Sequence, residues 1–454
     1  MLKLFAASIF CAAMLSVANL AEPAAPKPVS ATTASRGSEE NAASLKNQYT
    51  LFEAVQRALD YNFSVKASEE NVKAAENWRK SVRGSFGPAL STSYGYTQRQ
   101  LDDEDLYNWR VALTQDIFSG FATLAAYQKA ALQQDSSEAS LYKAKLDLIL
   151  TVQQNFFLYL KYSADVRSAA DSHRRLTEQL KVTGSFYDVG LRPRLDVLQA
   201  EVNVTEAEDV LLRANNAVET QRVRLNTLLN IPLNTQPEYV GNLDFIPFVA
   251  TLEQCLEQAY LRRPDLVMAK KSVAMAMQDR TSSASGFYPN IRGELAWATQ
   301  GDGWQANGSD LRPRDYSEWS VSVTGSLNLF EWGRTYYGVK QQTHIIAKLR
   351  AEEEELRQEV AFQVQARLLE LDNAAKRILV SRKGLEQARE AYRVASARYK
   401  SQVGTSIDVL DAQARLTQAE VSLTGAQADY LSALAALFTS MGAENHALAT
   451  QTEH

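Results

Sequence analysis

Apolar residues recur along the chain with the spacing of packed helices. Between positions 412 and 437 they alternate at steps of four and three residues: Ala412, Leu416, Ala419, Leu423, Ala426, Tyr430, Ala433 and Leu437. Residues 200–225 repeat this pattern, with Gln221 as the one polar interruption. The 3.5-residue period is typical of coiled coils. A second stripe of the same period on residues 407–438 predicts that this helix packs against two neighbours.

Prolines are missing from the same regions. None interrupts residues 89–192, and none follows Pro313. The apolar period and the absence of proline, which breaks helices, together predict long helices at residues 120–187, 193–229, 334–400 and 406–441. A helix of roughly 67 residues at 1.5 Å per residue is about 100 Å long. Taken alone, this evidence indicates a long helical bundle.

The chain contains two copies of one unit. Residues 51–58 match residues 252–259 at an offset of 201, and beyond the next loops the offset becomes 212, as for Asp196 and Asp408. We therefore expect a duplicated domain. The predicted parts are a first repeat at 49–232, a linker at 233–250, a second repeat at 251–442 and a tail at 443–454. Each repeat also starts with a predicted helix, at 51–84 and at 252–283.

Between the first helix and the long helices, each repeat has two segments that alternate apolar and polar residues. The clearest apolar set is Trp319, Val321, Val323, Leu327 and Leu329. Strands are predicted at 88–97, 109–118, 289–299 and 317–330, joined by polar loops at 98–108 and 300–316. One apolar and one polar face is typical of a strand with lipid outside and water inside, although a strand of a soluble sandwich shows the same alternation.

Four strands are too few to close a water-filled membrane barrel, because the smallest closed membrane barrels use about eight. We therefore expect the chain to form oligomers, and three copies would supply 12 strands.

The N-terminus has the features of an export signal. Met1-Leu2-Lys3 precedes an apolar run at residues 4–15, and Ser16-Val17-Ala18 offers a cleavage site. We predict a signal peptide at 1–18 and a flexible segment at 19–48; the alternative, a membrane anchor, needs about 20 apolar residues. After Ala18 no stretch approaches 18 uninterrupted apolar residues, so no transmembrane helix is expected.

Composition narrows the function further. The 48 Lys and Arg against 53 Asp and Glu give a net charge of −5, which argues against a nucleic-acid partner. The four histidines are scattered without ligand spacing, and no catalytic motif is present. We therefore predict no enzyme activity, no metal site and no cofactor.

Several short motifs, in order, resemble a known family. They are Gly286-Phe287-Tyr288-Pro289 before a strand, Leu329-Phe330-Glu331-Trp332-Gly333 after one, and the helical hairpin tips Phe186-Tyr187-Asp188-Val189-Gly190-Leu191 and Val403-Gly404-Thr405. The chain from about residue 49 to residue 442 is similar to the TolC-like outer-membrane channels of drug efflux and type I secretion.

The resemblance implies a membrane α+β fold. In this fold a trimeric 12-stranded β-barrel in the outer membrane is continuous with a periplasmic α-helical coiled-coil barrel. The implied function is a passive conduit for efflux of small molecules or type I secretion of polypeptides. An inner-membrane pump would energise it through a periplasmic adaptor. The alternative from the residues is a soluble periplasmic coiled-coil scaffold or adaptor, and the sequence does not name the cargo.

The same resemblance assigns roles to the hairpin tips. It implies contact with the periplasmic membrane-fusion adaptor by Val189, Gly190, Leu191, Val403, Gly404 and Thr405. A glycine at such a tip permits the positive φ of a helix C-terminus and a close approach by a partner. An equally good interpretation is that Gly190 and Gly404 only end their helices.

The resemblance also implies a periplasmic gate. Asp408 and Asp411 lie three residues apart, so both face one side of a helix, and a trimer would bring six such carboxylates around one pore. At about 6 Å two such charges repel by about 2–3 kcal/mol, which predicts cation preference and block by multivalent cations. Alternatively, Asp408 only starts its helix.

The remaining gate residues implied by the resemblance are Asp196, Tyr399, Arg192 and Arg194. Tyr399 is expected either to hydrogen-bond across the tip or to pack in the seam. The second turn is two residues shorter than the first and lacks the arginine that ties this turn to an aspartate in the family. We therefore expect Arg192 or Arg194 to pair with Asp408 or Asp411 instead.

Overall fold

The computed structural model describes residues 46–99, 104–301, 303–304, 306 and 316–445. The predicted signal peptide, residues 19–45 of the predicted flexible segment and the tail beyond residue 445 lie outside them. The described residues from Gln48 onward form one compact unit.

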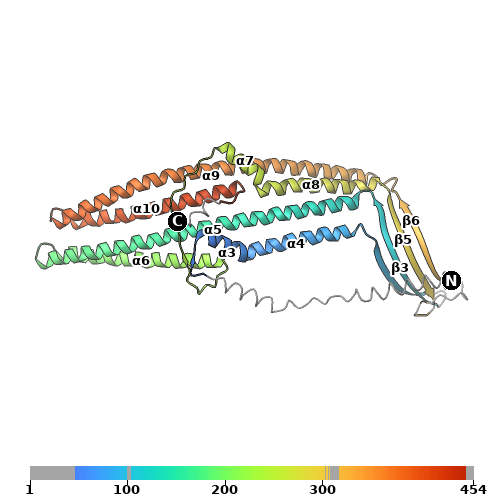
Figure 1. Cartoon of the computed structure of the whole chain (residues 1–454), viewed down its shortest axis with the longest axis horizontal. Coiled ribbons are helices and arrows are strands. Elements are labelled where there is room, and N and C mark those ends of the chain that lie inside the picture. The colour runs from blue at the N-terminus through green and yellow to red at the C-terminus, as the bar shows by residue number, and fades with distance from the viewer. Residues whose placement is uncertain (1–45, 100–103, 302, 305, 307–315, 446–454) are drawn as a thin grey trace. The chain divides into compact units, whose positions relative to one another are not determined.

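Long helices make up most of this unit (Figure 1). The helices are α3 (Leu51–Tyr61), α4 (Phe63–Gly84), α5 (Ala122–Asp188), α6 (Arg194–Leu228), α7 (Leu252–Arg262), α8 (Pro264–Ala284), α9 (Arg334–Lys400) and α10 (Ser406–Ser440), with a short 3₁₀ turn η1 at Ser285–Phe287. The four long helices predicted from the sequence are confirmed to within two residues at each end. None of the described helices has the length and apolar content needed to cross a bilayer.

The two predicted first helices are each broken once, which corrects the sequence-based expectation. Asn62 has extended backbone angles and accepts the Ser64 N–H, so α3 stops and α4 begins there. Arg263 is extended because the residue before a proline avoids helical angles, and α8 starts at Pro264.

The helices pack as two long hairpins with shorter helices continuing them. α6 returns along α5 and α10 returns along α9, while α4 packs on α5 and α8 packs on both α5 and α9. α10 contacts α9 and α5, so its two predicted neighbours are confirmed. Its second stripe is buried from Ala428 to Ala435, whereas Ile407 and Ala414 near the tip are exposed.

The polar residue that interrupts the first seam has hydrogen-bond partners. Gln221, the polar interruption noted in the heptad pattern, is buried and donates through Nε2 to the backbone oxygen and to Oδ1 of Asn155, both at 2.9 Å. This amide ties α6 to α5 where an apolar residue would only pack.

The strands form a four-stranded antiparallel sheet in the order β2-β3-β5-β6. The strands are β2 (Ala89–Arg99), β3 (Glu104–Ser119), β5 (Asn290–Gly301) and β6 (Tyr316–Ser326). β3 begins earlier than predicted, so half of the expected first loop is strand. β6 ends at Ser326 rather than at residue 330, because its partner β5 begins at Asn290, opposite Ser326, directly after Pro289.

The linker between the two repeats packs against both helical hairpins. Gln48–Tyr49 (β1) pairs in parallel with Glu238–Tyr239 (β4), and the Tyr239 hydroxyl donates to Asn226 at 2.8 Å. Further along, Phe245 stacks on Tyr430 of α10 with ring centroids 4.7 Å apart. The segment therefore holds helices of both repeats.

Candidate functional site

The register of the sheet brings the apolar positions of all four strands onto one face. One row across the strands consists of Leu90, Leu113, Leu295 and Val321, and the next row of Thr92, Val111, Trp297 and Trp319. Trp319 is 73% exposed and Val321 is 65% exposed. The apolar face expected for single strands is therefore shared by the whole sheet and open to its surroundings.

The opposite face is polar and carries ion pairs between β3 and β5. Arg292 pairs with Asp116 at 2.7 Å, and Arg110 pairs with Glu294. Serines and threonines occupy many of the other positions on this face. The sheet thus has one face suited to lipid and one suited to water.

Both edges of the sheet are open within the described chain. β2 pairs only with β3, and β6 pairs only with β5. The outer N–H and C=O groups of each edge strand can therefore pair with another strand.

The first hairpin tip is a helix end closed by a glycine. Gly190 has φ +78°, the Leu191 N–H donates to the Phe186 carbonyl at 2.8 Å, and the Gly190 N–H donates to the Tyr187 carbonyl at 2.9 Å. This pair of bonds is a Schellman motif. Val189 and Leu191 project from it and are exposed.

The second tip has the same motif, but glycine does not supply its positive φ. Gln402 has φ +64°, and the Val403 N–H donates to the Arg398 carbonyl at 3.0 Å. At Gly404 an added Cβ would lie 3.2 Å from the Arg398 Cβ and from the Tyr399 nitrogen. Gly404 therefore lets the chain pass close over the end of α9, and the expectation that it supplies a positive φ is wrong.

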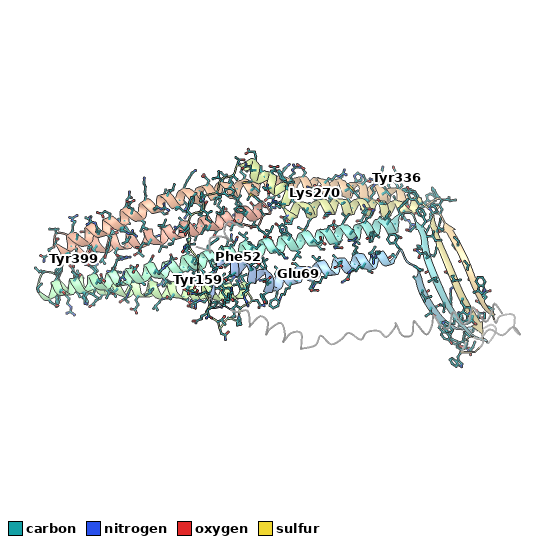
Figure 2. All side chains as sticks on the ribbon, in the orientation of Figure 1. Phe52, Glu69, Tyr159, Lys270, Tyr336 and Tyr399 are labelled. Atoms are coloured by element: carbon teal, nitrogen blue, oxygen red, sulfur yellow. The ribbon has the colours of Figure 1, made fainter. Side chains whose placement is uncertain are left out.

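Tyr399 joins the two tips, at the far end of α9 from the sheet (Figure 2). Its side chain is fully buried, and its hydroxyl lies 3.0 Å from the Thr183 hydroxyl of α5. Its ring packs on Phe186 with centroids 5.8 Å apart. Tyr399 thus both hydrogen-bonds across the tip and packs in the seam.

Arg192 links the first tip to the second through a backbone oxygen. Its guanidinium donates to the Gly404 carbonyl at 2.8 Å, lies 5.2 Å from the centre of the Tyr399 ring and is 4.0 Å from the Asp196 carboxylate. Arg194 is exposed on the first turn of α6. Neither arginine forms the expected pair with Asp408 or Asp411 within the chain.

Those two carboxylates have other partners. Asp408 and Thr405 form a capping box: Asp408 accepts the Thr405 N–H at 3.0 Å, and this bond lowers the pKa of Asp408. Asp411 pairs with Arg415 of the same helix at 3.1 Å and is exposed. Both aspartates lie in the first two turns of α10.

Sequence reasoning missed two parts of this site. Thr183 is a buried threonine in a long helix, and no motif marks it. The acceptor for Arg192 is a carbonyl, which every residue carries, so no residue type could signal it. Among the described residues no group of three or more His, Cys, Asp and Glu could hold a metal ion.

Comparisons with known proteins match this architecture. The family model described as outer membrane efflux protein matches residues 54–230 and again residues 255–443. The chain is 23% identical over 377 residues to the outer membrane protein TolC of Vibrio cholerae, covering 80% of this chain and 83% of that protein. It is 22% identical to the alkaline protease secretion protein AprF of Pseudomonas aeruginosa, covering 85% and 83%.

A solved structure shows the same fold. The CmeC outer membrane channel of Campylobacter jejuni aligns with a TM-score of 0.76 at 14% identity, covering 86% of this chain and 85% of that one. The family model matches most of the chain in two successive copies. The chain therefore belongs to the outer membrane efflux protein family, and the outer-membrane localisation expected from its sequence is confirmed.

Proposed function

We propose that the chain is the outer-membrane channel-tunnel of a tripartite export system. The observation that carries this proposal is the sheet with one shared apolar face and two open edges. An isolated sheet of this kind cannot satisfy its edges in lipid, but three copies joined β6 to β2 give a closed barrel of 12 strands. The long helices of the three copies then form the periplasmic tunnel.

The channel is a passive conduit in this proposal and not an enzyme. Its cargo is small molecules for efflux or polypeptides for type I secretion. An inner-membrane pump supplies the energy through a periplasmic adaptor that binds the hairpin tips. The exposed apolar side chains of Val189, Leu191 and Val403 support this contact, because such side chains next to a tight turn offer area to a partner.

The gate of the conduit lies at the start of α10 in this proposal. Three copies of Asp408 and Asp411 surround the pore, and Tyr399 and Arg192 hold the tips of each protomer together. An exposed aspartate such as Asp408 is ionised at neutral pH, and its capping bond lowers its pKa further, so the entrance favours cations.

Lysine substitutions at two adjacent residues of β6 test the proposed barrel directly. Val321 belongs to the apolar face and Ser322 to the polar face. A lysine near the middle of a lipid-facing surface costs about 2–4 kcal/mol, whereas a lysine in a water-filled lumen costs little. Val321→Lys should therefore abolish detergent-extracted trimers and their conductance in planar bilayers, and Ser322→Lys should retain both.

Extraction and conductance of the wild-type protein distinguish this function from the soluble scaffold. The channel-tunnel requires detergent for extraction and conducts in planar bilayers. A protein that leaves membranes in a salt wash, or that tolerates both lysines equally, would refute the channel and favour a soluble scaffold.

A further inference from the structure

A groove lies between α4, α5 and α8, in the part of the helical region that leads to the sheet (Figure 1). Its volume is about 510 Å³, which is within the range of small-molecule binding sites. None of the residues that line it carries a charge, although charged residues make up 22% of the chain. The groove is therefore an uncharged surface within a highly charged set of helices.

The groove combines a flat aromatic surface with uncharged hydrogen-bonding groups. Trp78 of α4 lines it and is 58% exposed. The side-chain amides of Asn71 and Gln133 and the hydroxyls of Ser136 and Ser140 also line it, and none of these four side chains has a hydrogen bond to a described residue. All of these groups are therefore available to a ligand.

The second repeat has charges at the equivalent positions. Trp78 corresponds to Asp279 at the offset of 201, and Ser140 corresponds to Glu352 at the offset of 212. Asp279 pairs with a lysine of α5 at 2.7 Å, and Glu352 pairs with Lys348 at 3.3 Å. Paired charges are what a helix surface in water ordinarily carries, so the duplicated fold by itself does not require the uncharged groove.

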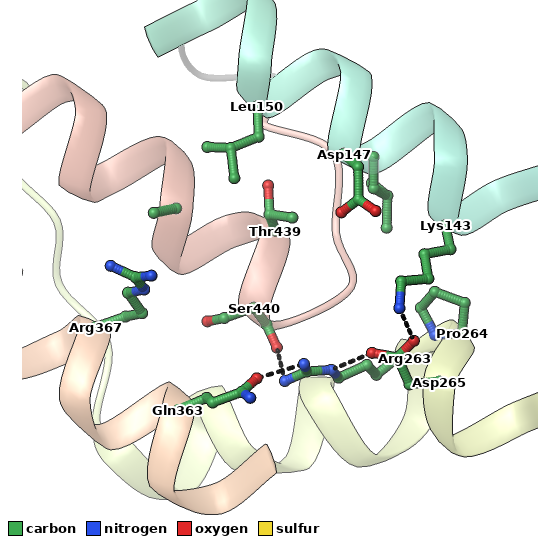
Figure 3. Close-up of a pocket in the computed structure, with 12 residues that line it drawn as sticks. Lys143, Asp147, Leu150, Arg263, Pro264, Asp265, Gln363, Arg367, Thr439 and Ser440 are labelled. Atoms are coloured by element: carbon green, nitrogen blue, oxygen red, sulfur yellow. Dashed lines mark hydrogen bonds and ion pairs between the residues drawn. The ribbon is translucent and has the colours of Figure 1, made fainter. Parts of the chain in front are cut away.

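Another cavity of the chain has the opposite chemistry. It lies between α5, α8, α9 and α10 and has a volume of about 450 Å³. Ion pairs run along its wall: Lys143 pairs with Asp265 at 2.7 Å, and Arg263 pairs with Asp265 at 3.3 Å (Figure 3). These charged groups satisfy one another, whereas the polar groups of the groove at Trp78 have no such partners.

The groove faces away from the linker between the repeats. On α5, Gln133 and Ser140 are seven residues apart, and the same stripe continues to residue 154. Phe156 lies two residues further, about 200° around the helix, and packs on Tyr239 of the linker with ring centroids 5.9 Å apart. In the proposed trimer three linkers would obstruct the lumen if they faced it, so the linker side is the outside and the groove opens into the lumen.

We propose that this groove binds a neutral sugar chain as it passes through the tunnel. The inference rests on the proposed channel function and names a class of small-molecule cargo for it. The indole of Trp78 stacks on the apolar face of a sugar ring. The amides of Asn71 and Gln133 and the nearby serine hydroxyls exchange hydrogen bonds with the hydroxyl groups of the sugar.

Other classes of ligand match only part of the groove. An apolar aromatic molecule would also stack on Trp78, but it would cover the amides of Asn71 and Gln133 without giving them partners. An anion or a cation would find no opposite charge among the lining residues. A neutral ring with many hydroxyl groups uses both the aromatic surface and the polar groups.

Equilibrium dialysis of radiolabelled maltohexaose against the detergent-extracted trimer tests the groove. The detergent must have no sugar head group, because such a group would compete. The wild type should bind the sugar, and Trp78→Ala should weaken binding at least about fivefold. Trp332→Ala is the matched control: it removes an indole that is 88% exposed and lies outside the groove, so it should leave binding unchanged.

The polar half of the groove is tested by Asn71→Ala combined with Gln133→Ala. This double variant should also weaken binding at least about fivefold, and it decides the matter if Trp78→Ala does not form trimers. A hexamer of galacturonic acid, which carries a carboxylate on every ring, should not bind. No binding to the wild type, no effect of the double variant, or equal binding of the acidic sugar would overturn the proposal.

The conductance of the wild type in planar bilayers is measured separately. A protein that binds maltohexaose through Trp78 but does not conduct would retain the groove and refute the channel. A protein that conducts but does not bind maltohexaose would retain the channel and refute the groove.

Discussion

Replacing Tyr399 by phenylalanine removes one hydroxyl group from the buried contact between the hairpin tips. The Thr183 hydroxyl gives its single proton to the Gln179 carbonyl at 3.0 Å, so Tyr399 is the donor in the bond to Thr183. Phenylalanine keeps the packing on Phe186 and leaves Thr183 with a partner. The loss is therefore one hydrogen bond, without an additional unsatisfied donor.

Such a bond contributes about 1 kcal/mol. In the proposed channel this free energy favours the closed tips, so its loss multiplies the ratio of open to closed tips by roughly five in each protomer. If three tips open together, the change approaches about 3 kcal/mol, which is roughly two orders of magnitude in that ratio.

Single-channel recording of the detergent-extracted trimer in planar bilayers measures this ratio as open probability. Tyr392→Phe is the matched control, because Tyr392 lies on the same helix and its hydroxyl has no hydrogen bond to any described residue. An open probability that is equal in the two variants, with both folded, would refute the role of the Tyr399 hydroxyl in holding the tips.

Three further predictions concern the tips. Arg192→Met loses the bond to the second tip, so hydrogen exchange at residues 402–406 should become about fivefold faster; unchanged exchange would contradict the link. Gly190→Ala should cost about 1 kcal/mol in thermal unfolding because of its positive φ, whereas Gly184→Ala, inside α5 with open space around it, should be neutral or stabilising. Asp408 has a lowered pKa, so the stability from its capping bond is present above its ordinary pKa and is lost as the pH falls through the lower, folded-state value. Block by multivalent cations should therefore be present at neutral pH and weaken in acid, where Asp408 takes up a proton; block that does not weaken in acid would argue against Asp408 as the blocking group.

The long helices could be predicted closely because two independent signals agreed on them. The heptad period marks α6 and α10, the lack of proline spans all four long helices, and packing reinforces what the pattern requires. The missed breaks also had local signals: an asparagine is a preferred helix N-cap, and Pro264 forces the preceding residue out of helical angles. A stricter reading of these two residues would have found both breaks.

The contacts at the tips were less accessible to sequence reasoning. Charge complementarity favoured pairing of Arg192 with Asp408 or Asp411, but the start of the helix offers each carboxylate a nearer partner: the Thr405 N–H for Asp408 and Arg415 for Asp411. Gln402 adopts a left-handed conformation that residue type does not suggest. Local bonds with short sequence separation therefore outcompeted the longer-range pair that charge alone indicated.

The open edges of the sheet have a consequence for biogenesis. Before it meets another copy, a newly exported chain has two edge strands with unpaired backbone N–H and C=O groups and an exposed apolar face. Strands of this kind promote aggregation. Such a chain avoids aggregation only while a chaperone covers β2 and β6, or when pairing with other copies of the chain is faster than aggregation. The yield of native protein should therefore depend on the balance between synthesis rate and chaperone supply more than on the stability of the single chain.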